Sequence, residues 1–299
     1  MLENRNIKML TGAFTALITP FNNNEIDEKS LVKLINWQID EGINGLVPVG
    51  TTGETPTLSH DEHAKVVEIC IKTTAGRVPV IAGAGSNSTA EAVEMVEFAQ
   101  KAGADGVLCV APYYNKPNQE GLFQHFSAIA KATDLPVILY NIPSRSIVDI
   151  SIDTMARLQN THENIAGVKD ATSDIGRVSL QRAQLGKGFI QFSADDMSAV
   201  GFNAHGGHGA ISVVSNIAPK LFTAMMDASL NGNFDEALRI QDKLAPLMSA
   251  LFIEPNPAGT KYVAQKLGLC QADLRLPMVP LTDTTKKIID AAMEHAGIA

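Results

Sequence analysis

Short apolar runs rich in β-branched residues recur eight times along this chain. Runs that are apolar throughout, rather than alternating with polar residues, are typical of parallel strands buried on both faces. The sequence therefore predicts eight buried parallel strands. The runs are AFTALIT from Ala13, GLVPVG from Gly45, PVIAGAG from Pro79, GVLCVA from Gly106, PVILYN from Pro136, IAGVKD from Ile165, FIQFSA from Phe189 and GAISVV from Gly209.

Segments with helical periodicity lie between these runs. The first places Leu31, Leu34 and Ile35 near one face, and others end at glycine, as helices commonly do. Eight strand and helix units predict a (β/α)8 barrel. A doubly wound sheet is the alternative, but the even spacing and the lack of GxGxxG after the first run argue against it. The predicted helices cover residues 28–41, 61–75, 89–102 and 119–132.

The barrel does not use the whole chain of 299 residues. We expect a loosely held tail at residues 1–9, a catalytic barrel at residues 10–230 and a C-terminal helical region at residues 231–299. The last barrel helix is predicted near residues 217–230. Further helices at 233–250 and 284–296 are joined through two proline-rich stretches, EPNPAG and LPMVPLTD.

Composition excludes several classes of protein. Hydrophobic residues make up 45% and charged residues 19%, which is typical of a globular protein. The net charge of -8 argues against a nucleic-acid partner. The N-terminal MLENRNIKML has no apolar core of a signal peptide, and no apolar stretch is long enough to span a membrane. The widely separated Cys70, Cys109 and Cys270 favour reduced, buried thiols and a cytoplasmic location.

The active site of such a barrel lies at the carboxyl ends of its strands. Lys169 stands at the end of one predicted strand, after Val168. Burial disfavours an ammonium and lowers its pKa, and a neutral amine can form a Schiff base with a carbonyl compound. A lysine that pairs with Asp170 or another carboxylate is an equally compatible interpretation.

Other strand ends carry hydroxyl groups and a guanidinium. Thr51, Tyr114 and Tyr140 can pass protons, although residues of these types are more often structural, and Tyr113 and Tyr114 can be explained by packing at a loop. Arg145 can bind a carboxylate with two hydrogen bonds, or form a surface salt bridge. The GTTGE turn from Gly50 offers backbone amides and two hydroxyls to a small carboxylate or an oxyanion.

Metal and cofactor signatures are weak. The pairs in HDEH, from His60 to His63, and in HGGH, from His205 to His208, do not match HExxH or a zinc ligand set. No cofactor fingerprint is present. We therefore expect no metal and no cofactor, with the chemistry carried by side chains.

The ordered motifs GTTGE, PYYNKP, YNIPSR, GVKDAT and GGHGAISV resemble those of the 4-hydroxy-tetrahydrodipicolinate synthase (dihydrodipicolinate synthase) family. That family belongs to the wider pyruvate-dependent lyase superfamily, which also contains N-acetylneuraminate lyase. The resemblance runs from about Met9 to the C-terminus. It implies a homotetramer, a dimer of dimers, of (β/α)8 barrels with C-terminal helices.

The resemblance also implies roles for single residues. Lys169 would form a Schiff base with pyruvate, and the enamine would attack L-aspartate 4-semialdehyde. Tyr140, Thr51 and Tyr114 would form a proton relay, with Tyr114 reaching a neighbouring subunit. Arg145 would engage a substrate carboxylate. The remaining pyruvate-binding residues would be Gly50, Thr52 and Ile211.

Feedback inhibition by L-lysine is a further implication of the resemblance. Glu91 would pair with the ammonium of the inhibitor, and Asn87 and Tyr113 would hold its carboxylate. Pro56 stands where small residues are common in lysine-sensitive members, so it bears on potency. The positions that match the inhibitor site are Thr55, Pro56, His60, His63, Asn87, Glu91 and Tyr113.

Two other functions are compatible with these motifs. A sister aldolase acting on N-acetylneuraminate or a keto-deoxy sugar acid would keep Lys169 and Tyr140, and a silent paralogue would serve as a scaffold. One departure from the family concerns Ser144 and Ser146, where many members have Gly and Thr. Ser144 would be strained if its φ angle were positive.

Overall fold

The computed structural model describes residues 10–298, so the predicted tail at residues 1–9 lies outside the described residues. Eight parallel strands form one sheet in the order β4-β1-β10-β9-β8-β7-β6-β5. A parallel bridge between Leu46 and Val80 links the β4 and β5 ends of that order, which closes the sheet into a barrel. The strands are β1 (Gly12–Ala16), β4 (Gly45–Val47), β5 (Ile81–Gly83), β6 (Gly106–Val110), β7 (Val137–Asn141), β8 (Ile165–Asp170), β9 (Ile190–Ser193) and β10 (Gly209–Ser212).

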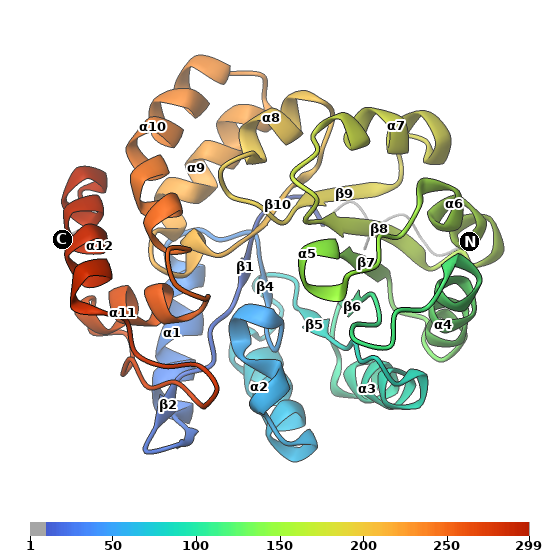
Figure 1. Ribbon diagram of the computed structural model, residues 1–299, viewed down its shortest axis with the longest axis horizontal. Helices are drawn as coiled ribbons and strands as arrows, with labels where there is room; N and C mark the ends of the chain where they lie inside the picture. Colours follow the sequence, from blue (N-terminus) through green and yellow to red (C-terminus); the bar gives the residue numbers. More distant parts are fainter. Residues whose placement is uncertain (1–9, 299) are drawn as a thin grey trace.

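Helices surround the barrel (Figure 1). The barrel layer contains α1 (Glu28–Asp40), α2 (His60–Thr74), α3 (Thr89–Ala102), α4 (Gln119–Lys131), α6 (Ile152–Thr161), α7 (Gly176–Leu185), α8 (Ala199–Ala204) and α9 (Pro219–Leu230). The short α5 (Pro143–Ser146) follows β7 and lies over the carboxyl ends of the strands instead (Figure 1). Local signals set their ends: Ser59 and Glu62 form a capping box at the start of α2, and α3 ends at Gly103 with φ 92°.

Three more helices follow the barrel. They are α10 (Phe234–Ala250), α11 (Ala258–Lys266) and α12 (Asp283–Ala296). α10 packs against both α9 and α12, so these helices lie on one side of the barrel (Figure 1). Short elements complete the fold: the hairpin β2 (Phe21–Asn22) and β3 (Glu25–Ile26), and the 3-10 turns η2 (Thr51–Gly53), η3 (Thr55–Thr57) and η4 (Val214–Asn216). No helix in the described part of the chain is long and apolar enough to cross a membrane.

Two hydrophobic layers hold the barrel together. Inside it, Phe14 and Phe192 pack with their ring centres 5.2 Å apart, among buried residues from several strands. A larger layer, to which Leu34, Val67 and Phe126 contribute, fills the space between the strands and the helices. Each strand is therefore buried on both faces, which is why its sequence is apolar throughout.

The prediction of a (β/α)8 barrel with C-terminal helices is confirmed, and all eight predicted strands are present. The predicted helix boundaries agree within about two residues. α11 was not predicted, since it begins within the first proline-rich stretch, EPNPAG. Its Thr260 and Lys261 are fully buried, which disrupts the apolar periodicity that marks a helix.

Candidate active site

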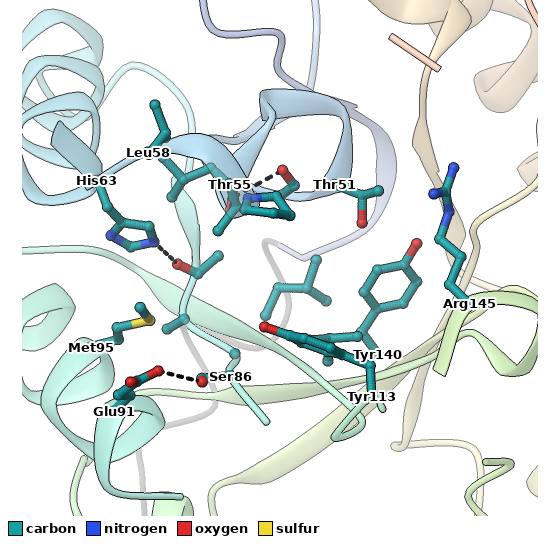
Figure 2. A pocket seen from close by; sticks show the side chains of 18 of the residues that line it. Thr51, Thr55, Leu58, His63, Ser86, Glu91, Met95, Tyr113, Tyr140 and Arg145 are labelled. Atoms are coloured by element: carbon teal, nitrogen blue, oxygen red, sulfur yellow. Dashed lines mark hydrogen bonds between the residues drawn. The ribbon is translucent and has the colours of Figure 1, made fainter. Parts of the chain in front are cut away.

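A cavity opens at the carboxyl ends of the strands, and it has two regions (Figure 2). Thr51, Tyr140 and Arg145 lie together at one end. His63 and Glu91 lie at the other end, with Tyr113 between the two groups in this view. Gly50 also lines the cavity. The structure therefore brings residues from the turn after β4, from β7 and from α5 to one site.

Lys169 and Tyr140 are neighbours across the sheet. They are register partners at the ends of β8 and β7, and Lys169 Nζ lies 4.4 Å from the centre of the Tyr140 ring. Both residues are 6% exposed. Burial lowers the pKa of Lys169 to about 8, and the charge of Asp196 opposes that shift. A useful fraction of the amine is therefore neutral near physiological pH.

The carboxylate of Asp170 has other partners, so the interpretation in which it pairs with Lys169 is wrong. Asp170 Oδ2 accepts hydrogen bonds from Arg177 Nε at 3.1 Å and from Gln181 Nε2 at 2.9 Å. These partners belong to α7, outside the barrel. Lys169 instead shares the barrel interior with Tyr140.

Asp196 is a buried acidic residue whose charge acts on Lys169, and the sequence analysis missed it. It is 4% exposed, and its Oδ2 accepts hydrogen bonds from the backbone N–H groups of Val213 and Val214. Its Oδ1 is buried and has no hydrogen-bond partner among the described residues. Burial raises the pKa of Asp196 to about 6. The acidic pair in FSADD, after the seventh barrel strand, was the available signal.

Tyr140 is linked to two other cavity residues. Burial raises the pKa of its phenol, while a hydrogen bond with Thr51 and the charge of Arg145 lower it in part. Arg145 is exposed at the cavity, and it makes no ion pair with any other residue between 10 and 298. Its guanidinium is thus available to an anionic ligand.

The GTTGE turn is held by contacts from distant parts of the chain. Asn256 Nδ2 donates a hydrogen bond to Thr52 Oγ1 at 3.0 Å, and Glu54 forms an ion pair with Lys261 at 2.5 Å. Val49 and Glu54, on either side of the two threonines, have φ angles of 49° and 56°. Left-handed residues at such positions persist only where the surroundings determine them strongly.

Two other predicted residues, Ile211 and Tyr114, differ in their exposure to solvent. Ile211 is fully buried in β10. Tyr114 is 90% exposed, with φ 71°, and it is outside the set of residues that line the cavity of its own chain. Its phenol is therefore exposed to solvent or to another molecule.

The far end of the cavity contains most of the residues predicted to bind lysine. Thr55, Pro56, His60, His63, Glu91 and Tyr113 all line it. His63 Nε2 lies 2.9 Å from the carbonyl oxygen of Gly83, and burial lowers the pKa of this imidazole. Ser86 donates a hydrogen bond to Glu91 at 2.7 Å. Asn87 lies beside this group and donates to the carbonyl oxygen of Tyr113 at 3.2 Å.

The YNIPSRS stretch has a different conformation from the one considered for Ser144. Residues 143–146 form the short helix α5, and the left-handed residue is Ile147, with φ 66°. Ser144 is exposed and helical, so it is not strained. Ser146 is fully buried, and its single hydroxyl proton is shared between the carbonyl oxygens of Ile142 and Val148, each 2.9 Å from Oγ.

The two histidines of HGGH form hydrogen-bond contacts within the fold. His208 Nδ1 accepts a hydrogen bond from the backbone N–H of Gln191 at 3.1 Å, and His205 Nδ1 lies 3.2 Å from Ser179 Oγ. Within residues 10–298, no group of three or more His, Cys, Asp or Glu side chains is arranged to hold a metal ion.

Comparison with known proteins adds the family context. The model of the "Dihydrodipicolinate synthetase family" matches residues 9–296. The 4-hydroxy-tetrahydrodipicolinate synthase of Bartonella quintana (strain Toulouse) is 61% identical over 291 residues, which cover 97% of this chain and 99% of that protein.

Solved structures agree over nearly the whole chain. The chloride-inhibited dihydrodipicolinate synthase of Acinetobacter baumannii, complexed with pyruvate, has a TM-score of 0.94 at 42% identity, covering 97% and 99% of the two chains. The enzyme of Cyanidioschyzon merolae with lysine bound has a TM-score of 0.94 at 35% identity, with the same coverage. A monomeric dihydrodipicolinate synthase variant has a TM-score of 0.94 at 39% identity, covering 98% and 99%. The chain therefore belongs to the dihydrodipicolinate synthetase family.

Proposed function

We propose that this protein condenses pyruvate with L-aspartate 4-semialdehyde to give 4-hydroxy-tetrahydrodipicolinate, the committed step of diaminopimelate and lysine biosynthesis. The observation that carries the proposal is the position of Lys169, buried beside Tyr140 with its pKa lowered to about 8. The names of relatives such as the Bartonella quintana enzyme support the choice of substrates.

The first step forms a Schiff base on Lys169. Neutral Lys169 Nζ attacks the ketone carbon of pyruvate, and loss of water leaves an iminium ion. Removal of a methyl proton then gives an enamine, whose carbon attacks the aldehyde of the second substrate. The amino group of that substrate then attacks the imine carbon, which closes the ring of the product and releases Lys169 Nζ. Water is released once and protons move at each stage, so the site needs a proton path as well as an amine.

The hydroxyl groups around Tyr140 provide that path. Thr51 lies beside Tyr140 in the cavity and lowers the pKa of its phenol, and we infer that Tyr114 of a neighbouring subunit completes the relay. Thr52 and the amides after Gly50 bind the pyruvate carboxylate, together with the backbone near Ile211. Arg145 binds the carboxylate of the semialdehyde at the cavity entrance.

Borohydride trapping followed by a coupled assay tests this function. Incubation with pyruvate and borohydride is expected to leave one reduced adduct, on Lys169. If no adduct forms, the protein is neither the synthase nor a sister aldolase. Turnover of pyruvate and the semialdehyde, with no cleavage of N-acetylneuraminate, identifies the synthase. An unreactive chain in both assays supports the scaffold alternative instead.

We also propose that L-lysine inhibits the enzyme at the far end of the cavity. Glu91 would pair with the inhibitor's ammonium, and Asn87 and Tyr113 would hold its carboxylate. The lysine-bound structure of a relative supports this site. Its proximity to Thr51 and Tyr140 in one cavity offers a route by which the ligand affects catalysis (Figure 2).

Substitution of Glu91 tests the lysine site. Glu91→Gln is expected to raise the lysine concentration for half inhibition about tenfold or more, because the ammonium loses its charged partner. Glu94→Gln, on an exposed position of the same helix, is the control. Wild-type activity that is unaffected by millimolar lysine rules the proposal out.

The assembly and its setting are also proposed. We infer a homotetramer, a dimer of dimers, in which the exposed Tyr114 enters a neighbouring site. A mass measurement in solution tests this assembly, since a monomeric relative is known.

A cytoplasmic location is supported by the three free, buried thiols. We further propose that residues 10–230 form the catalytic barrel and that the helices from 231 onward form a separate appendage to it.

A further inference from the structure

The residues that follow Tyr140 and Lys169 face away from the barrel interior. Successive side chains of a strand point to opposite faces, so Asn141 and Asp170 point outward. They are register partners, and they are 0% and 3% exposed, respectively. Neither has a role in the proposed chemistry, yet both are polar groups at the end of a catalytic strand.

Arg177 of α7 connects these two strand ends. Its Nε donates to Asp170 Oδ2 at 3.1 Å, and its Nη1 donates to Asp149 Oδ2 at 3.1 Å. Asn141 Nδ2 donates to the other oxygen of Asp149 at 2.7 Å. The four side chains therefore form one chain of hydrogen bonds, whose two ends, Asn141 and Asp170, are adjacent in the sheet. We call this group the Arg177 clamp (Asn141, Asp149, Asp170 and Arg177).

The clamp also closes the base of the loop that carries Arg145. The backbone N–H of Ile150 donates to Asn141 Oδ1 at 2.9 Å, and Arg177 Nη2 donates to the carbonyl oxygen of Ile150 at 3.1 Å. Residue 141 enters the loop and residues 149–150 leave it. The clamp therefore anchors α5 at both ends of its loop.

Charge and burial make Arg177 hard to replace. The side chain of Asp170 is 2% exposed and that of Arg177 is 15% exposed, while Asp149 is partly exposed at 45%. One guanidinium thus forms ion pairs with two carboxylates. Its planar fork serves Asp170, Asp149 and a carbonyl oxygen at once, which the single ammonium of a lysine cannot do.

We propose that Arg177 is a positioning residue for the proposed reaction: it touches no substrate, and it sets the relative placement of Lys169, Tyr140 and Arg145. The inference rests on the proposed function. A shift of about 1 Å between reacting groups can reduce a rate about 100-fold. The clamp joins the residues that directly follow Tyr140 and Lys169 in their strands, so a change in the clamp would shift both reacting groups.

Arg177→Met and Arg177→Lys test the proposal. Arg177→Met is expected to lower kcat about 10- to 100-fold, to raise KM for the semialdehyde more than KM for pyruvate, and to move the pH midpoint of borohydride trapping. Arg177→Lys is expected to recover only part of the loss. Arg157→Met is the control. It removes a half-exposed arginine of the neighbouring α6, which pairs with Glu120 of α4, and it should change kcat less than about twofold.

The readouts separate a positioning role from a loss of stability, because a merely destabilised enzyme keeps the wild-type pH midpoint. Wild-type kcat, KM values and pH midpoint in a folded Arg177→Met variant overturn the proposal. If that variant does not fold, Asp149→Asn decides: it opens the clamp at its exposed carboxylate, and unchanged kinetics there overturn the proposal as well. Failure of the wild-type enzyme to trap pyruvate refutes the proposed function, and this inference with it.

Discussion

Lys169 Nζ lies 4.4 Å from the centre of the Tyr140 ring, and the two residues are register partners on β8 and β7. The amine is therefore held in a buried position next to a phenol. That environment lowers the pKa of Lys169 to about 8 through burial, and the charge of Asp196 limits the shift.

The first prediction concerns pH. The neutral amine is the nucleophile, so the rate of pyruvate trapping is expected to rise with pH, with its midpoint near pH 8. Asp196→Asn removes a negative charge that favours the ammonium, so the midpoint should move to lower pH. The effect should be largest above pH 6, where Asp196 is mostly ionised. Trapping rates across a pH series measure both midpoints.

Asp134→Asn is the control for this experiment, since Asp134 is an exposed residue on the amino-terminal side of β7. Its midpoint should match that of the wild type. A midpoint in Asp196→Asn that is unchanged or higher would contradict the electrostatic role assigned to Asp196.

The second prediction concerns the buried ion pair between Glu54 and Lys261, whose side chains are 2% and 0% exposed. Lys261→Met leaves the Glu54 carboxylate buried without its partner, and the free energy of unfolding is expected to fall by about 3–5 kcal/mol. The double variant Glu54→Gln/Lys261→Met should recover part of that loss, because it removes the buried charge. Urea denaturation at a fixed protein concentration measures these changes.

Lys286→Met breaks a much more exposed pair with Asp283 and should change the free energy of unfolding by less than about 1 kcal/mol. Equal effects at Lys261 and Lys286 would mean that burial does not govern these pairs.

The third prediction concerns Ser146. Its hydroxyl bonds to the carbonyl oxygens of Ile142 and Val148 at the two ends of α5. Ser146→Ala is expected to destabilise the protein by about 1 kcal/mol and to raise KM for the semialdehyde, because Arg145 is on the same turn. Ser144→Ala, at the exposed neighbour, should leave both quantities unchanged. Melting curves measure the stability and steady-state kinetics measure KM. Equal values for the Ser146→Ala and Ser144→Ala variants would refute this role of Ser146.

The fourth prediction concerns the thiols. Cys70, Cys109 and Cys270 are all buried, and burial raises the pKa of Cys70 to about 12 and that of Cys270 to about 11. The thiolate is the reactive form, so a disulfide reagent should modify none of them in the native protein at neutral pH. All three should react after unfolding in urea. Rapid modification of the native protein would contradict this prediction.

Several residues of the candidate site could be located from the sequence because they lie at or just after strand ends. Lys169, Tyr140 and Arg145 each follow an apolar run, and in a barrel the carboxyl ends of the strands meet at one face. Asp196 could have been found by the same reasoning, since it follows the run that ends in FSADD. The conformation of Ser144 could not, because a four-residue helix has too few residues to show a periodic pattern.

The sequence by itself determined the eight buried strands, most of the surrounding helices and the polar groups at the strand ends, because each of these depends on neighbours within a few residues. Only the tertiary structure decided that Arg177 bridges Asp149 and Asp170, that Lys261 neutralises Glu54, and that Asn256 reaches Thr52. The Lys261 and Asn256 contacts join residues about 200 positions apart. Such pairings arise from how the strands and helices pack in three dimensions, and no local pattern in the chain encodes them.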